Sequence, residues 1–510
     1  MGNAATRSVA LIGLDGAIVE VEASVTSGLA AFVLVGLADT ALGEARHRVR
    51  AAATSSGCPL SAHSTTINLG PASLPKHGSA FDLAIALAAL AADAKISAES
   101  VGRVLHIGEL GLDGRLRPTP GILPAVLAAR RAGAATVMVP RGSLTEAELV
   151  PGVRVIGIAS LREAAIWHGA ELEPVPVEAI AAPSPQDPRA ASPDLADVVG
   201  GGDAVNALVA AAAGGHHMLL LGPPGAGKTM LATRLPGLLP DLDDDAALEV
   251  GSLRSLAGLP VGGALSRRPP FEAPHHTAST AAIVGGGSRQ LRPGAAARSS
   301  HGVLFLDEAP EFAPSTLDAL RQPLECGEIT IQRAAAVARF PARFQLVLAA
   351  NPCPCGQAGS RDAECVCTPN ARRRYLQRMS GPLLDRVDIR LRVPRVTAAQ
   401  LRTGNSGRPL GTAEARDIVE AARGRALSRL AGTGWRCNSA VPGSWLRSSA
   451  GVPARGASVA LDRALERGLL TMRGHDRVLR LAWTLADLDD VDRPTAEHIG
   501  RALYLRRAAA

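Results

Sequence analysis

The stretch "HHMLLLGPPGAGKTM", His216 to Met230, decides the fold of the central part of this chain. The largely apolar run His217–Leu221 predicts a buried strand, and the pattern G-x-x-x-x-G-K-T follows it from Gly222 to Thr229. In a strand–loop–helix setting, backbone N–H groups of such a turn and the positive end of the next helix bind phosphate groups. The stretch therefore predicts a nucleotide site, and the alternative is a glycine-rich turn that matches by chance.

The loop itself would supply most of the contacts to ATP and Mg²⁺, the cofactors that we expect. Lys228 would bind the β and γ phosphates with a compact positive charge, and Thr229 would offer its hydroxyl to Mg²⁺. Of the 54 basic residues only Lys76, Lys95 and Lys228 are lysines, so a lysine at this position stands out. The residues expected to bind nucleotide or metal are Gly222, Pro223, Pro224, Gly225, Ala226, Gly227, Lys228, Thr229 and Asp307.

Two further apolar runs end in polar residues that suit hydrolysis. "GVLFLDE" ends at Asp307, which would hold Mg²⁺ through water, and Glu308, which would polarise the attacking water. "RFQLVLAANPCP" delivers Asn351 to the end of another predicted strand, where its amide could orient that water. Each motif alone has a plain alternative: a strand that reaches a turn, or an asparagine that begins a turn before Pro352.

An arginine that would complete the site comes from "SGPLLDRVDIRL", residues 380–391. Here the chain resembles the AAA+ ATPases, in which a neighbouring subunit of a ring donates an arginine finger from this position. The resemblance assigns that role to Arg386, whose guanidinium would stabilise charge that develops during phosphoryl transfer. The alternative is an ordinary surface pair between Asp385 and Arg386.

A second arginine would come from the C-terminal helical part. Arg480, in "RGHDRVLRLAWTLADL", matches the sensor-2 arginine of the same ATPases. The resemblance implies that it reaches over the γ-phosphate from a helical lid. Arg477 and Arg473 lie one and two turns earlier on the same helix and remain alternatives.

Longer stretches resemble one family more closely. "RRPPFEAPHHTASTAAIVGGG", "RPGAAARSSHGVLFLDEAPEF" and "LDALRQPLECGEITIQR", with the cysteine-rich segment that follows, occur in the order typical of the YifB/ComM family of magnesium-chelatase-like AAA+ ATPases. The resemblance covers nearly the whole chain. Two departures concern adenine and DNA contacts: "DVVGG", residues 197–201, lacks a glutamine, and Glu272 stands where the family has a cation.

The resemblance implies a function that residue spacing alone does not give. It implies an ATP-hydrolysing ring, most often a hexamer, that acts on single-stranded or branched DNA as a branch-migration helicase during recombination or uptake of foreign DNA. The alternative is a magnesium-chelatase-like ATPase that remodels a protein partner.

The N-terminal part resembles the proteolytic domain of Lon proteases. "PKHGSAF", residues 75–81, and the stretch 107–140 follow the turn and helix that carry a serine–lysine dyad in those enzymes. Aligned in this way, the serine position falls on Ala80 and the lysine position on Leu123. Ser79 is one residue early, and a serine without a base is a poor nucleophile. We therefore expect a scaffold that does not cut peptides and that contacts DNA or organises the ring.

Four cysteines lie within fifteen residues: Cys353, Cys355, Cys365 and Cys367. Four thiolates can close a tetrahedral zinc site. The C-x-C spacing is tighter than the usual C-x₂-C, so free or redox-active thiols remain the alternative. Arg372, Arg373 and Arg374 follow the cluster and could meet a nucleic-acid backbone or begin a solvated helix.

These observations predict a multidomain α/β protein. We expect a Lon-like α+β domain over 1–172, a proline-rich linker over 173–193, an AAA+ core of magnesium-chelatase type over 194–394 with a cysteine-rich insertion at 353–367, and a helical lid over 395–510. An odd cysteine count without a secretory signal favours the cytoplasm. No apolar run is long enough for a membrane span, so no membrane partner is expected.

Overall fold

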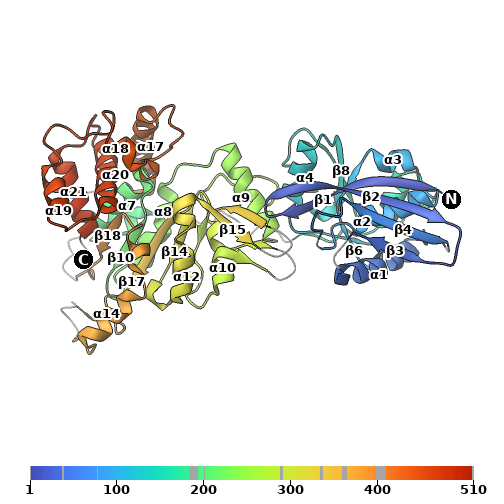
Figure 1. The fold of residues 1–510 in the computed structure, drawn as a ribbon, viewed down its shortest axis with the longest axis horizontal. Coiled ribbons are helices and arrows are strands. Elements are labelled where there is room, and N and C mark those ends of the chain that lie inside the picture. Colours follow the sequence, from blue (N-terminus) through green and yellow to red (C-terminus); the bar gives the residue numbers. More distant parts are fainter. Residues whose placement is uncertain are drawn as a thin grey trace.

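The computed structural model describes residues 2–36, 39–61, 63–76, 78–182, 193–199, 201–287, 291–332, 337–358, 364–397 and 409–507. The fold is mixed α/β with a helical C-terminal part. Figure 1 shows the N-terminal part at one end of an elongated molecule, a second sheet in the middle and the C-terminal helices at the other end. Residues 173–182 of the expected linker form no helix or strand, and 183–192 lie outside the described residues.

The N-terminal part is built on a mixed sheet in the order β3-β4-β2-β1-β5-β8-β9. β1 and β2 form a long antiparallel hairpin, whereas β5, β8 and β9 continue the sheet in parallel. Helix α2 packs against β1 and β2 and is buried along its whole length, because its sequence, DLAIALAALAA, is apolar on nearly every side. The elements are β1 (Asn3–Ile12), β2 (Asp15–Thr26), β3 (Phe32–Val35), α1 (Asp39–Ser55), β4 (Ser64–Gly70), α2 (Asp82–Ala92), α3 (Ala98–Gly102), β5 (Leu105–His106), β6 (Glu109–Leu110), β7 (Leu116–Arg117), α4 (Ile122–Arg131), β8 (Thr136–Pro140), α5 (Leu144–Ala147), β9 (Arg154–Ile158) and α6 (Leu161–Trp167).

The central part carries a second sheet in the order β11-β14-β17-β10-β18, in which every neighbouring pair is parallel. Strands β10, β14 and β17 are buried at every residue, as expected for apolar parallel strands covered on both faces. The elements are α7 (Gly202–Gly214), β10 (Met218–Leu221), α8 (Lys228–Leu238), α9 (Asp244–Leu256), β11 (Phe271–Glu272), α10 (Thr280–Val284), β12 (Gly285–Gly286), β13 (Arg292–Pro293), α11 (Ala295–Arg298), β14 (Val303–Leu306), α12 (Pro314–Ala319), α13 (Pro323–Cys326), β15 (Glu328–Gln332), β16 (Val337–Pro341), β17 (Gln345–Ala350), α14 (Pro369–Gln377), α15 (Gly381–Leu384) and β18 (Ile389–Arg392).

The C-terminal part is helical. Helix α20 begins where the Thr471 hydroxyl accepts the N–H of Gly474, and its apolar face, including Val478 and Leu485, is buried against neighbouring helices. The helices are α17 (Thr412–Arg429), α18 (Gly443–Leu446), α19 (Val459–Glu466), α20 (Met472–Leu488) and α21 (Ala496–Arg507). Across the described residues of the chain, no helix is both long enough and apolar enough to pass through a bilayer.

The N-terminal part rests on the central part through α4 and α9. The Gly121 N–H donates to the Ser255 carbonyl at 3.0 Å, and the N–H of Leu123 lies 3.3 Å from the Ser255 hydroxyl. The two parts therefore meet at α4, the helix that contains Leu123.

Candidate functional site

The phosphate loop lies at the carboxyl edge of the central sheet. The Gly222 N–H donates to the Ala350 carbonyl at 3.1 Å, which fixes the loop to the end of β17. Gly225 and Gly227 have φ angles of 75° and 85°, a region that favours glycine, and α8 begins at Lys228. This is the strand–loop–helix arrangement expected from the sequence, with the N-terminus of α8 available to an anion.

The loop borders an open cavity of about 400 Å³. The loops after β14 and β17 contribute the opposite wall, because the carboxyl ends of parallel strands meet at one edge of the sheet. The structure therefore brings three separate sequence motifs together. The lining residues are Pro224, Gly225, Ala226, Gly227, Lys228, Thr229, Met230, Asp307, Glu308, Ala350 and Asn351.

Lys228 joins two of these motifs directly. Its Nζ donates to the Gly222 carbonyl at 2.7 Å and to Asn351 Oδ1 at 3.0 Å. Burial lowers the pKa of Lys228 below its usual value, and the carboxylates of Asp307 and Glu308 oppose that shift. The cavity thus holds a cation beside a neutral amide, a combination that suits a phosphate chain.

The acidic residues face the loop from β14. The Thr229 hydroxyl donates to Asp307 Oδ2 at 2.7 Å, so the two oxygen ligands expected for Mg²⁺ are adjacent. Glu308 has a φ of 50°, in the left-handed region, and its Oε2 lies 3.2 Å from Nδ1 of His276. Backbone in this region costs a non-glycine residue of the order of 1 kcal/mol or more, and such conformations concentrate at functional sites.

His276 is a residue that sequence reasoning did not connect with the pocket. It precedes Glu308 by 32 positions, and the sequence favours a structural or pore-loop role for the pair His275–His276 over a metal pair, because adjacent side chains point to different sides. The contact arises because β11 and β14 pair in parallel, which brings the segment after Glu272 to the carboxyl end of β14, and the sequence carried no signal for this pairing.

Arg386 does not line the cavity. It follows α15, its side chain is only 8% exposed, and it forms an ion pair with Glu325. Its Nη1 also donates to the Pro382 carbonyl at 2.5 Å. Arg473, on α20, lies 4.0 Å from the same Glu325 carboxylate and is 69% exposed. Two of the predicted arginines therefore share one acidic partner away from their own subunit's pocket.

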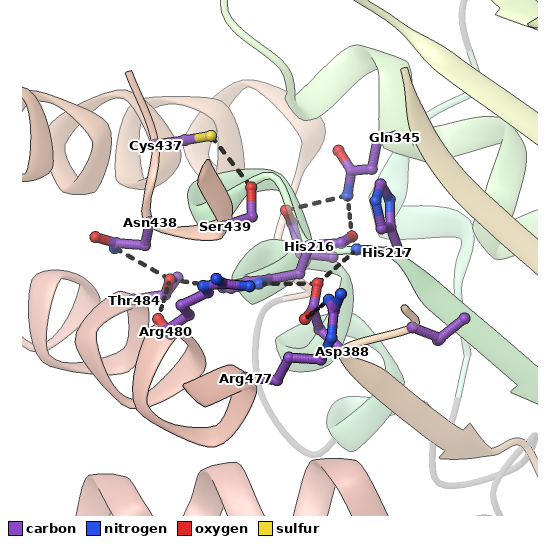
Figure 2. A network of polar contacts seen from close by, with 12 residues as sticks. His216, His217, Gln345, Asp388, Cys437, Asn438, Ser439, Arg477, Arg480 and Thr484 are labelled. Atoms are coloured by element: carbon purple, nitrogen blue, oxygen red, sulfur yellow. Dashed lines mark hydrogen bonds and ion pairs between the residues drawn. The ribbon is translucent and has the colours of Figure 1, made fainter. Parts of the chain in front are cut away.

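Arg480 is also not at the cavity. The strands β10 and β18 run in parallel with Met218 opposite Ile389, so Asp388 lies at the amino edge of the sheet and the phosphate loop at the carboxyl edge. Arg480 donates to the Val441 carbonyl at 2.7 Å and is held near Asp388 (Figure 2). The structure therefore does not bring Arg480 over the phosphate loop of its own subunit, because this part of α20 packs at the opposite edge of the sheet.

The four cysteines lie directly beyond Asn351. All four Sγ atoms are within 4.8 Å of one another, and Cys353 is fully buried. The backbone N–H of Gln357, followed by the Cys353 thiol, lowers the pKa of Cys355 to about 6, whereas burial raises the pKa of Cys353 and the pKa of Cys367 is raised to about 11. The thiolate is the form that binds metals.

Ala80 and Leu123, the positions that the sequence comparison aligned with a serine–lysine dyad, lie against one apolar cluster. Leu123 is fully buried in it, and Ala80 packs on its edge. Lys76 lies four residues before Ala80 and is buried. Its Nζ donates to the Leu74 carbonyl at 3.1 Å. Ser79 donates a hydrogen bond to Glu109.

Comparison with known proteins gives one consistent result. Three family models match in succession: subunit ChlI of Mg-chelatase over 21–143, magnesium chelatase subunit ChlI over 194–401, and the C-terminal part of that subunit over 410–506. An uncharacterised protein of Mycobacterium tuberculosis is 49% identical over 504 residues, 99% of this chain and 98% of the relative.

Two bacterial relatives carry names. The competence protein ComM of Haemophilus influenzae is 38% identical over 509 residues, 99% of this chain and 98% of that protein. The uncharacterised protein YifB of Escherichia coli is 38% identical over 502 residues, 98% of this chain and 96% of that protein. The similarity thus extends along almost the full length of each.

Proposed function

Because this chain belongs to the magnesium chelatase subunit ChlI family and is related to ComM and YifB along nearly its whole length, we propose that it is an ATP-hydrolysing ring motor that acts on DNA. The observation that carries the proposal is the convergence of Lys228, Asp307 and Asn351 on one open cavity. The relative named a competence protein suggests the setting: recombination or uptake of foreign DNA.

The residues at the cavity fit ATP and Mg²⁺. Lys228 and the N–H groups of the glycine loop would bind the phosphates, and Thr229 with Asp307 would hold Mg²⁺. The metal would withdraw charge from the phosphate oxygens when bound. Glu308 would orient and deprotonate water, Asn351 would hold that water in place, and His276 would control where the Glu308 carboxylate points.

The arginines are proposed to act between subunits. Arg386 and Arg473 share Glu325 and do not line their own cavity, so a nucleotide that they contact would belong to a neighbouring copy of the chain; Arg473 is exposed for this role, and Arg386 would have to leave Glu325. Arg480, although it matches sensor 2 in sequence, donates to the Val441 carbonyl at the amino edge, whereas Arg473 is exposed, so Arg473 is the better placed candidate.

Mixing two inactive variants tests this arrangement. Arg386→Ala subunits keep an intact cavity, and Lys228→Ala subunits keep an intact arginine. If Arg386 acts across the interface, mixed rings regain part of the hydrolysis that neither variant has alone. Mixed rings with no more activity than the separate variants would contradict a role in trans.

DNA is the proposed partner because exposed cations lie beside the motor. Helix α14 exposes Arg373 and Arg374, immediately after the cysteine cluster. Guanidinium groups suit phosphate backbones. The N-terminal part is proposed to be a Lon-like scaffold without peptidase activity, since Ala80 and Leu123 offer neither nucleophile nor base. We also propose that the protein is cytoplasmic and hexameric, and that zinc occupies the four cysteines.

The competing function is a chelatase-like ATPase that remodels a protein partner. Hydrolysis rates measured with no DNA, with single-stranded DNA, with duplex and with a branched junction separate the two. A DNA motor is expected to hydrolyse ATP faster with at least one of these DNAs, with binding that weakens as salt rises. Equal rates in all four mixtures, together with no salt-sensitive DNA binding, would favour a protein substrate.

A further inference from the structure

We propose that Cys353, Cys355, Cys365 and Cys367 bind one zinc ion whose role is to hold the loop after β17 against the phosphate loop. This inference rests on the proposed ATP site and extends it. The metal would be a positioning element of the nucleotide cavity, not only a stabiliser of a surface insertion.

The sulfur positions suit a single tetrahedral ion. The Sγ of Cys353 lies 3.4 Å from that of Cys355 and 3.6 Å from that of Cys365, and the Cys355–Cys365 separation is also 3.6 Å. A tetrahedral ion with Zn–S bonds of about 2.3 Å requires sulfurs about 3.8 Å apart. A disulfide would bring two sulfurs to about 2.05 Å. The cysteines converge on one point instead of forming two pairs.

The surroundings of the sulfurs also favour a bound cation. The N–H of Ala358 donates to Cys353 Sγ at 3.4 Å, and the turn begins with the Gly356 N–H donating to the Cys353 carbonyl at 2.9 Å. A backbone N–H that points at a sulfur stabilises a thiolate. Four thiolates select a soft ion, and zinc is the usual occupant of a closed four-cysteine site.

The cluster is attached to the nucleotide cavity at two points. Cys353 is two residues after Asn351, so the metal would fix the end of β17 that carries this side chain. Gly356 lies against the phosphate loop: a Cβ at this position would be 2.5 Å from Cδ of Pro224. Asn351 and Pro224 both line the cavity, and the same short turn connects them through the cysteines.

Bound zinc and free thiols would have different effects on the phosphate loop. Without an ion, only the intervening peptide chain joins the segment with Cys353 and Cys355 to the segment with Cys365 and Cys367, and no cross-link holds their sulfurs together. The turn at Gly356 would then lose its support, and the phosphate loop would lose a packed neighbour. Metal content and nucleotide affinity are therefore expected to change together.

Metal analysis of the purified full-length protein is the first test. We expect about one zinc per chain, loss of that zinc in Cys365→Ser, and full retention in the matched control Cys326→Ser, whose thiol is exposed and outside the cluster. A wild-type protein that holds no zinc even after supply of zinc sulfate, or that holds iron in its place, would overturn the assignment.

Binding of a fluorescent ATP analogue is the second test. We expect Cys365→Ser to weaken binding by about tenfold or more, since small displacements of binding groups have effects of this size. Gly356→Ala should keep the zinc but also weaken binding, because its Cβ meets Pro224. Gly434→Ala is the matched control: its φ of 81° gives similar backbone strain, but no atom lies within 4 Å of its Cβ.

The outcomes separate this inference from the proposed function. Lys228→Ala should lose nucleotide and keep zinc. If wild-type protein holds zinc but binds no ATP analogue, the proposed ATP site is wrong and the metal assignment stands. If Cys365→Ser and Gly356→Ala both bind the analogue as tightly as wild type, the coupling between the cluster and the phosphate loop is refuted, whatever their zinc content.

Discussion

The two edges of the central sheet use charge in opposite ways. At the carboxyl edge, Lys228, Asp307 and Glu308 surround an open cavity. At the amino edge of the same strands, His216 and Asp388 are at most 1% exposed and are enclosed by the helical part (Figure 2). One edge leaves its charges available to a ligand, and the other pairs them within the protein.

The amino edge shows how completely buried charge is matched. Asp388 accepts from Arg477 at 2.6 Å and from the His217 N–H at 3.2 Å, and it lies 3.4 Å from Nδ1 of His216. These partners hold the pKa of Asp388 well below its usual range despite full burial, with Arg477 the largest favourable influence. The network fastens α20 to the core and fixes the chain two residues after Arg386, so it also positions the proposed finger.

A charged residue found by a sequence pattern must be placed on one edge of the sheet before a role can be assigned to it. The helical pattern of α20 defines a buried face, but it does not reveal against which edge of the sheet that face packs. The resemblance to AAA+ ATPases assigns Arg480 to nucleotide sensing, but in the structure it donates to the Val441 carbonyl and lies near Asp388.

The largest effect on stability is expected from Arg477→Met. The substitution leaves Asp388 buried without its cation, and breaking a buried pair costs about 3–5 kcal/mol of unfolding free energy. Chemical denaturation followed by circular dichroism would measure it. The control is Arg473→Met, one turn earlier on α20 and 69% exposed, which is expected to change stability by about 0.5 kcal/mol or less. Equal losses would mean that the amino edge is not a closed charge network.

Lys228→Ala is the counterpart at the carboxyl edge. The loss of a charged hydrogen-bond donor to phosphate should reduce the binding free energy by about 3 kcal/mol, which corresponds to roughly 100-fold weaker nucleotide binding. Unfolding free energy should change far less than in Arg477→Met. Titration of a fluorescent ATP analogue measures the binding, and Lys95→Ala, an N-terminal lysine paired with Asp93, is the control. Unchanged affinity in Lys228→Ala would mean that the phosphate loop does not bind the nucleotide.

A smaller effect is expected from pH at the amino edge. Burial lowers the pKa of His217 to about 4, and its Nδ1 accepts the N–H of Leu346 at 3.0 Å. The unfolded chain takes up a proton near pH 6.5 while the folded chain does not, so stability is full above that pH and falls as pH decreases toward 4. The charged or titratable groups that act on His217 are Asp388, Arg477, His216 and Arg480.

The measurement is the unfolding free energy at pH 7.5 and pH 5.0 in wild type and in His217→Gln. His217 should account for a loss of about 2 kcal/mol over this range. Other buried histidines, His106 and His168, also have lowered pKa values, so the quantity to compare is the difference between the two proteins. The same pH dependence in both would contradict a His217 that stays neutral in the folded protein.

Much of the cavity was predictable because it depends on strand ends. Apolar runs that finish at Gly222, Asp307 and Asn351 had to meet if their strands were parallel and neighbouring, and they do. The contact between His276 and Glu308 was not predictable, because it depends on the short strand β11 and on a segment without periodicity. The buried network at the amino edge was not predictable from the sequence either, because His216 and Asp388 look like ordinary polar residues at the start of strands.

The most direct measurement of the central claim is the comparison of ATP binding and ATP hydrolysis in Glu308→Gln. The amide keeps the size of the side chain but cannot accept the proton of the attacking water, so turnover should fall by about 100-fold or more. Affinity for the ATP analogue should stay close to that of wild type, and Glu311→Gln, three residues later and outside the cavity, should hydrolyse normally. Hydrolysis by Glu308→Gln at a rate near that of wild type would show that the Glu308 carboxylate does not activate the attacking water.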